Sequence, residues 1–295
     1  MPDSEGDSLS QLPPQQQPDN TSFFVGKLES CNFKNVIRIF KSITIKKAAC
    51  FYVTERGLKI IVQESGNYQV TAYLQRDIFE YFQCLPPAPL KEIGFKVCLD
   101  ILLNCLQMFV EVPGETTTGQ FTYKADGHPL CVQLEQSGFF TSCDIKTMDI
   151  ITPAVDVQFL EKNLISRMIC KSDCFRDALH SLLAFPCRSF EVRVTKMAPY
   201  FLLRTVCDNV VCEVTVSKDS DFVERFQCDE ETTFSYRTVL IRAAMKPLLI
   251  SEKTSIRIDK HGVMALQFMI RNTENDTVSF VEIYGVPEQE PEEDD

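Results

Sequence analysis

The chain contains two similar nine-residue segments, and the distance between them is the strongest constraint on its fold. The first is RDIFEYFQC (76–84) and the second is SDFVERFQC (220–228), which begins 144 residues later in a chain of 295. At aligned positions the segments share Asp, Glu, Phe, Gln and Cys. A short match can arise by chance, so the repeat is informative only if its surroundings also repeat.

The pattern at the start of each half does repeat, at an offset of 142 residues. Residues 23–28 have the composition of a strand, and residues 32–43 have a helical hydrophobic period. The same plan returns as a predicted strand over 164–172 and a predicted helix over 173–185, with Asp173 as the expected N-cap. The two halves of the chain therefore begin with the same supersecondary unit.

The remainder of each half corresponds as well. A second helical pattern lies at 98–110 in the first half and at 238–250 in the second, where Pro247 should end or kink the helix. Short β-rich runs fill the rest of both halves. The sequence thus predicts an α+β chain made of two tandem, similar domains, each with antiparallel sheets and two helices.

Composition shifts place the expected boundaries. The predicted parts are an acidic arm (1–21), a first domain (22–145), an extended connector (146–158), a second domain (159–287) and an acidic tail (288–295). The first twenty residues carry four acidic side chains, the last eight carry six, and neither segment has a Lys or Arg. Without them, the formal charge of −11 falls to −1. We expect both ends to be disordered and the body to be nearly neutral.

Cysteine usage and hydropathy indicate a reducing compartment. The thirteen cysteines are odd in number and include no C-x-x-C pair. The N-terminus also lacks the basic region and apolar run of a signal peptide. Reduced thiols are therefore expected rather than a disulfide framework or a zinc site. No apolar run approaches 18 residues, which predicts no membrane span. The longest basic run is Lys46–Lys47, so nuclear import would need a partner or another route. No metal or other cofactor is expected.

A search for catalytic patterns leaves one alternative open. None of the common phosphate-loop, dinucleotide, zinc-protease or nucleophile-elbow motifs occurs. Asp77 and Glu80 recur as Asp221 and Glu224, which would suit either turn chemistry repeated with the domain or part of a two-metal 3′–5′ exonuclease. The turn interpretation is favoured, and the chain is not expected to be an enzyme.

Cationic side chains recur on the predicted helices, opposite their apolar faces. The stripe includes His180 and spaces its members three or four residues apart within each helix. If the helices line one surface, these side chains would face the phosphates of DNA, whereas on isolated helices they would be ordinary solvated positions. No aromatic residues alternate with them to stack bases. The candidate DNA-facing residues are Lys34, Arg38, Lys41, Arg176, His180, Arg242 and Lys246.

With this plan in view, the sequence resembles the DNA sliding clamps of the PCNA family. Four segments, PYFLLRTV, KDSDFVERFQC, SIRIDKHGVMALQFMIRN and VSFVEIYGVPEQE, are similar to the Rad-one family of checkpoint clamp subunits. The resemblance covers about residues 22–287 and is strongest in the second half. It implies a heterotrimeric ring of Rad-nine-type, Rad-one-type and Hus-one-type subunits, with helices lining the hole. A homotrimeric replication clamp is the alternative assembly.

The resemblance also implies partners and sites. Such rings encircle double-stranded DNA without sequence specificity in the nucleus, are opened and closed by a clamp loader at damaged or stalled replication sites, and serve checkpoint and repair proteins as a platform. Subunits join through edge strands, here nominating Gly138–Ile145 and Asn209–Ser217, while the connector borders a pocket for partner peptides. The implied interface residues are Phe139, Phe140, Ser142, Val210, Val211, Glu213 and Thr215, and the implied pocket residues are Met148, Ile150, Ile151 and Pro153.

Overall fold

The computed structural model describes residues 21–64, 68–109, 115–151, 159 and 161–288. Within this part of the chain, strands and helices follow the order expected from the repeat. The first half contains β1 (Phe24–Leu28), α1 (Ser30–Ser42), β2 (Ala48–Thr54), β3 (Gly57–Glu64), β4 (Tyr68–Gln75), η1 (Arg76–Ile78), β5 (Tyr81–Cys84), β6 (Ile93–Cys98), α2 (Leu99–Leu106), β7 (Thr117–Tyr123), β8 (Leu130–Gln136) and β9 (Phe139–Ile145).

The second half repeats the order β-α-β-β-β-β-β-α-β-β-β, after a short 3-10 turn. It contains η2 (Glu161–Asn163), β10 (Leu164–Lys171), α3 (Ser172–Leu183), β11 (Ser189–Val194), β12 (Phe201–Cys207), β13 (Val210–Val216), β14 (Val223–Cys228), β15 (Thr232–Arg237), α4 (Val239–Leu248), β16 (Lys253–Asp259), β17 (Met264–Arg271) and β18 (Val278–Gly285).

Strand pairing repeats along with strand order. β1 pairs with β5 and β7, as β10 pairs with β14 and β16. The two repeated segments hold equivalent places, because Cys84 lies opposite Phe24 in β1 and Cys228 lies opposite Ser166 in β10. Phe24 and Ser166 are themselves 142 residues apart, which is the offset found in the sequence.

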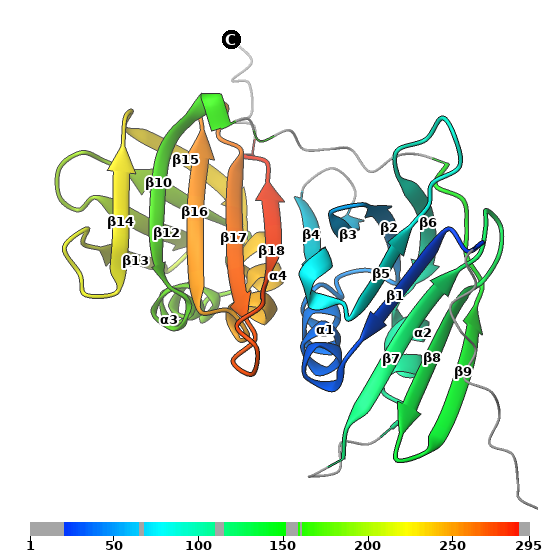
Figure 1. Cartoon of the computed structure of the whole chain (residues 1–295). Helices are drawn as coiled ribbons and strands as arrows, with labels where there is room; N and C mark the ends of the chain where they lie inside the picture. The colour runs from blue at the N-terminus through cyan, green and yellow to red at the C-terminus, as the bar shows by residue number, and fades with distance from the viewer. Residues whose placement is uncertain (1–20, 65–67, 110–114, 152–158, 160, 289–295) are drawn as a thin grey trace, which may run out of the picture.

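The nine-stranded sheet is the feature that joins the halves. In the described residues the sheets have the orders β5-β1-β7-β8-β9, β14-β10-β16-β17-β18-β4-β3-β2-β6 and β13-β12-β11-β15. The nine-stranded sheet crosses between the halves where β18 pairs antiparallel with β4, at the centre of Figure 1. β9 and β13 each end a sheet, so each carries an outer backbone edge without a partner strand among the described residues.

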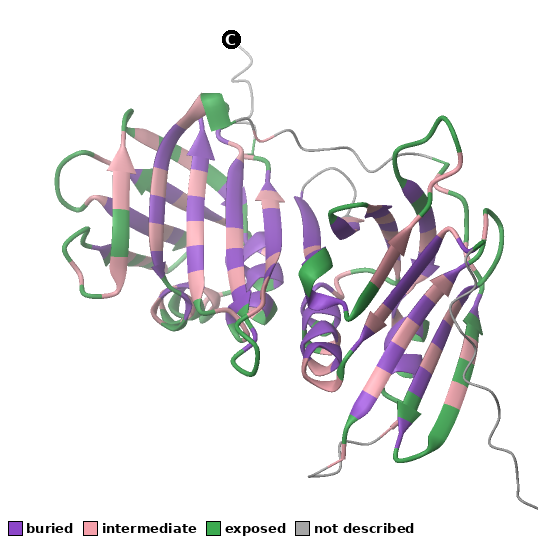
Figure 2. Ribbon diagram, in the orientation of Figure 1, coloured by how far each residue is buried: buried purple, intermediate pink, exposed green. Residues whose placement is uncertain are grey.

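The helices form one layer on the sheets. α2 packs beside α1, α1 beside α4 and α4 beside α3, and Figure 1 shows this series along one side of the molecule. Figure 2 shows the buried stripes of the strands alternating with more exposed ones, as expected when only one face of a pleated sheet meets the core. Within that core, Phe51 stacks on Phe95 with ring centroids 5.5 Å apart. No helix in the described ranges is long and apolar enough to cross a bilayer.

Two expectations about helix ends have opposite outcomes. Pro247 was expected to end or kink its helix, and α4 does end one residue later, at Leu248. The N-cap prediction for Asp173 is wrong, since α3 begins at Ser172 and Asp173 lies in its first turn. The Asp173 carboxylate accepts the N–H of Cys174 at 2.8 Å. A negative charge there still stabilises the helix, because it lies near the positive end of the helix dipole.

Candidate DNA-facing helices and subunit edges

The cationic stripe of α1 lies on the helix face away from the core. Phe33 and Phe40 are buried under the sheets, whereas Arg38 and Lys41 are exposed and Lys34 is half-buried. The helical period makes this separation, because residues three and four apart share a face. No ion pair involving these three cations occurs in the described residues, so their charge is available to a ligand.

The stripes of α3 and α4 are partly engaged within the chain. Arg176 is half-buried and pairs with Asp177 at 3.2 Å, and His180 is exposed one turn further along α3. On α4, Arg242 and Lys246 are exposed, and Lys246 Nζ donates to the backbone oxygen of Thr44 at 3.1 Å. Arg176 therefore brings less net charge to the helix layer than Arg38 does.

The fourth helix, α2, carries no cation. Its exposed residues are Ile101 and Asn104, followed by Gln107 and Met108 just beyond the helix, and Asp100 is half-buried. Because α2 ends the helix series, the cationic helices α1, α4 and α3 are consecutive neighbours. The positive side chains are therefore grouped on three adjacent helices of one layer.

The two nominated edge strands carry their candidate residues at exposed positions. In β9, Phe139, Phe140 and Ser142 are exposed. In β13 the side chains alternate, with Val210 half-buried and three others exposed. Glu213 is held by Arg204 of β12 at 3.2 Å. The exposed β13 residues are Val211, Glu213 and Thr215.

The start of the connector runs along the far edge of the nine-stranded sheet. Met148 exchanges two backbone hydrogen bonds with Lys96 of β6, at 2.8 and 2.9 Å. Ile150 lies against Gly94, where an added Cβ would stand 3.4 Å from its Cδ1, and Ile151 is 92% exposed. Pro153, the fourth nominated pocket residue, lies outside the described residues.

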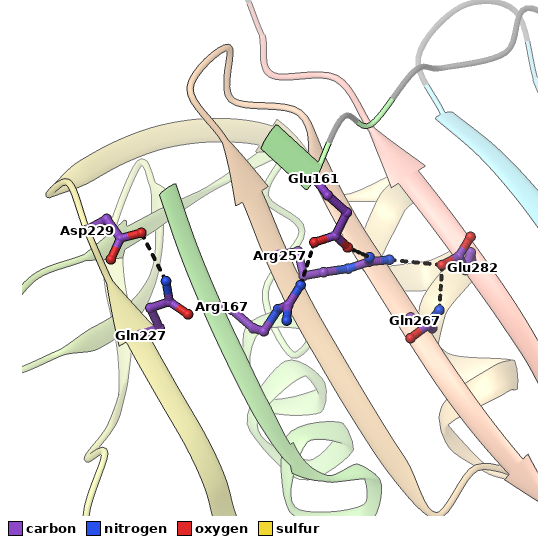
Figure 3. A network of polar contacts seen from close by, with 7 residues as sticks. All are labelled: Glu161, Arg167, Gln227, Asp229, Arg257, Gln267 and Glu282. Atoms are coloured by element: carbon purple, nitrogen blue, oxygen red, sulfur yellow. Dashed lines mark hydrogen bonds and ion pairs between the residues drawn. The ribbon is translucent and has the colours of Figure 1, made fainter. Parts of the chain in front are cut away.

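An outer-face polar network fixes the chain just after the connector, and sequence reasoning missed it. Glu161 in η2 accepts from Arg167 at 2.7 Å and from Arg257 at 2.6 Å, as Figure 3 shows. Arg257 also donates to Glu282 at 2.9 Å, and Gln267 donates to the same Glu282 oxygen at 2.7 Å. These contacts join η2 to side chains of four strands of the sheet, β10, β16, β17 and β18.

Aromatic contacts extend the network. The Arg257 guanidinium lies over the ring of Phe159, 5.0 Å from its centroid, and Phe159 also packs near Tyr284. Burial, and next the negative charge of Glu282, raise the pKa of Tyr284, so its phenol stays protonated and donates to Glu282 at 2.5 Å. Figure 3 also shows a separate contact at the end of β14, where Gln227 donates to Asp229, the residue just after the strand, at 2.9 Å.

The repeated carboxylates take part in local contacts rather than in a shared cluster. Glu80 pairs with Lys27 and Glu224 pairs with Lys253, each at 2.8 Å, and Asp77 lies exposed in η1. In the described part of the chain, no group of three His, Cys, Asp or Glu side chains is arranged to hold a metal ion. These contacts are local, as expected if the repeated segment serves turn chemistry.

Cysteines depart from expectation at one pair. Cys187, before β11, and Cys207, at the end of β12, form a disulfide with Cα atoms 5.5 Å apart, where reduced thiols were expected. They lie 20 residues apart in the sequence, and the fold brings them together. Elsewhere burial raises the thiol pKa values, to about 12 for Cys170 and about 11 for Cys84, which keeps these groups protonated and weakly nucleophilic.

Comparison with solved structures defines the class. The fold matches proliferating cellular nuclear antigen from Entamoeba histolytica with a TM-score of 0.71 and 17% identity, covering 91% of this chain and all of that one. It matches PCNA from Thermococcus kodakaraensis with a TM-score of 0.70 and 13% identity, covering 90% of this chain. The chain therefore has the PCNA-like clamp fold, an α+β arrangement of antiparallel sheets and helices.

Sequence relatives define the family within that class. Residues 24–270 match the family described as "Repair protein Rad1/Rec1/Rad17", to which the chain belongs. It is 33% identical to the mouse (Mus musculus) cell cycle checkpoint protein RAD1, covering 88% of this chain and 91% of the relative, and 31% identical to the human (Homo sapiens) protein of that name, covering 93% and 95%. Membership makes the chain a checkpoint and repair protein of a non-catalytic clamp family, which removes the exonuclease alternative.

Proposed function

We propose that the chain is one of three different subunits of a nuclear ring that encircles duplex DNA at damaged or stalled replication sites. A clamp loader opens and closes the ring, which then presents checkpoint and repair proteins to the DNA. The other two subunits are of the Rad-nine and Hus-one types. Within the chain, residues 22–145 and 159–287 are the two clamp domains, joined by the connector at 146–158.

The proposal rests on one observation: β18 pairs with β4 inside the chain, but the equivalent strands β9 and β13 have no partner strand in the described residues. β18 is the last strand of the second half, and β9 is the last strand of the first. β4 ends the β2-β3-β4 run as β13 ends the β11-β12-β13 run. Inside the chain β18 pairs with β4, whereas β9 and β13 face outward without partner strands in the described residues. A β9-type edge and a β13-type edge on different subunits would continue the same arrangement around a ring.

The helix layer suits DNA held by topology. Three adjacent helices expose cations, whereas the charge outside the two acidic ends is close to zero. A few inward cations give weak, sequence-independent attraction to phosphates, which permits sliding. Tight binding would oppose sliding, so a strongly basic surface is not required of a closed ring.

The connector supports a partner-peptide site on the outer face. Met148 and Ile151 present exposed apolar side chains beside β6, and Ile150 packs against Gly94. Downstream, the Glu161 network fixes the point at which the chain rejoins the sheet. A peptide with apolar anchors could pack against the exposed side chains, and Pro153 is included in this proposal as the next apolar position along the chain.

The assembly is tested first with the purified chain. We expect light scattering to show no trimer of the chain alone, and a ring only after two different clamp subunits are added, because in the heterotrimer that the resemblance implies, the β9 and β13 edges each pair with a different subunit. A stable species near three times the 33.6 kDa chain mass would instead support the homotrimeric alternative.

DNA contact is tested by reversing charge on the helix layer. Changing Lys34, Arg38 and Arg176 together to Glu should leave the ring assembled and lower its retention on duplex DNA by about tenfold, with a weaker salt dependence, because fewer phosphates are neutralised. A matched control changes Lys91, Lys124 and Lys196 to Glu, three exposed lysines on loops rather than helices. Equal retention by the two triple variants, measured over a salt series, would mean that the stripes are only solvated faces.

A further inference from the structure

The two outward edges differ in the size of the apolar groups that they expose. On β9, Phe139 and Phe140 are 71% and 59% exposed, and their side chains lie on opposite faces of the strand. On the other edge, the exposed apolar groups are Val211 of β13 and Val206, which lies opposite it in β12. One edge thus offers two aromatic rings, and the other offers two small branched side chains.

The chain beside each edge differs in the same way, since it exposes large apolar side chains next to β9 and polar side chains next to β13. Cys143 of β9 contacts the sulfur of Met108 at 3.5 Å, which places Met108 beside the β9 edge. Ile101 is also exposed, on α2, the helix that precedes Met108 and packs beside β9. Next to β13, by contrast, α3 exposes Asp177 and Ser181. We define the β9 patch as Ile101, Met108, Phe139 and Phe140, and the β13 patch as Val206 and Val211.

The β18–β4 strand pair inside the chain indicates what covers the β9 patch. There β18 pairs with β4, and beside the pair α4 packs on α1, with Lys246 donating to the backbone oxygen of Thr44 just after α1. On its helix side β4 contributes Val70 and Ala72, which are fully buried. The occupant of the equivalent place beside β9 is therefore a strand-and-helix edge with small apolar side chains on another clamp subunit.

We infer that the two joints made by this chain are unequal: the β9 patch holds one neighbouring subunit tightly, and the β13 patch forms the weaker joint, at which the ring opens. This inference rests on the proposed ring. Both joints gain similar backbone hydrogen bonds from strand pairing, so the difference in their binding free energies comes from the side chains. Buried aromatic anchors dominate binding energy at interfaces, and valines contribute less.

The experiment uses the full chain with each of the two other clamp subunits, first singly and then together. The variants are Phe139→Ser with Phe140→Ser, and the matched double variant Val206→Ser with Val211→Ser. All four side chains are exposed in the isolated chain, so thermal unfolding should be unchanged and serves as the folding control. Binding is measured by titration calorimetry, and ring assembly by light scattering.

We expect the wild-type chain to bind one neighbour at least about tenfold more tightly than the other. The Phe double variant should weaken that tight pair by about 100-fold or more, and the Val double variant should leave it unchanged and weaken the other pair by about tenfold. If a three-subunit ring forms but the Val variant weakens binding as much as the Phe variant, the inference is wrong and the proposed function stands. If no ring forms with wild-type chain, both fail.

Discussion

Replacing Glu282 by alanine is expected to lower the free energy of unfolding by about 3 kcal/mol, because Arg257 loses one of its two carboxylate partners and two further donors lose their acceptor. The Glu282 side chain is 8% exposed and that of Arg257 is 11% exposed. One carboxylate oxygen accepts from Arg257 and Gln267, and the other accepts from Tyr284. Urea unfolding of the wild-type chain and the variant measures the difference.

A matched surface pair provides the control for Glu282. Glu252 pairs with Arg271 at 3.1 Å, and both side chains are more than 40% exposed. Glu252→Ala should therefore cost less than about 1 kcal/mol, since solvent screens exposed ion pairs. Equal losses for the two alanine variants would show that the outer-face network contributes no more than a surface pair. Glu282→Gln should fall between the two, because it keeps one acceptor and loses the charge.

Replacing Asn32 by alanine is expected to cost about 2–4 kcal/mol, because four hydrogen bonds at a buried site lose their partner. Asn32 donates to the backbone oxygen of Ile78 at 2.7 Å. Its oxygen accepts from Asn272 at 2.8 Å, Asn275 at 3.0 Å and Thr277 at 3.1 Å. These contacts bind the loop between β17 and β18 to the start of α1, so hydrogen exchange over 272–277 should also speed up.

Asn35 is the control on the same helix. It is buried as Asn32 is, but its side-chain oxygen has no hydrogen-bond partner. Asn35→Ala should therefore cost less than about 1 kcal/mol, since it removes a group that is already poorly satisfied. The prediction for Asn32 is contradicted if the two variants unfold at the same urea concentration, or if exchange in the loop does not change.

The sequence repeat was sufficient to predict the fold class and the order of elements. A duplicated segment at 142–144 residues, with a helical period at 32–43 and again at 173–185, leaves few alternatives to two related units. Helix ends were less predictable: the pattern at 98–110 yields a helix only over Leu99–Leu106. Hydrophobic period identifies a buried face, but it does not determine where the last turn unwinds.

The tertiary contacts could not be predicted, because they depend on which surfaces meet. Arg257 and Glu282 stand at strand positions that alternation assigns to solvent, and η2 with Phe159 covers them in the fold. Asn32 resembles any polar residue near a helix start until the 272–277 loop meets it. The cationic stripes were found from spacing, although the sequence gives no indication that Arg176 is partly neutralised by Asp177.

The pairing of β18 with β4 also has a consequence for how the chain is made. Tyr73 lies opposite Phe280, so the two strands are synthesised about 200 residues apart. At ribosomal rates of about 5–20 residues per second, the edge of β4 waits roughly 10–40 seconds for its partner. An open edge is a template for wrong pairing with other chains. We therefore expect the newly made first half to be the stage most prone to wrong pairing, and slowing translation of the second half should lower the yield of correctly folded chain.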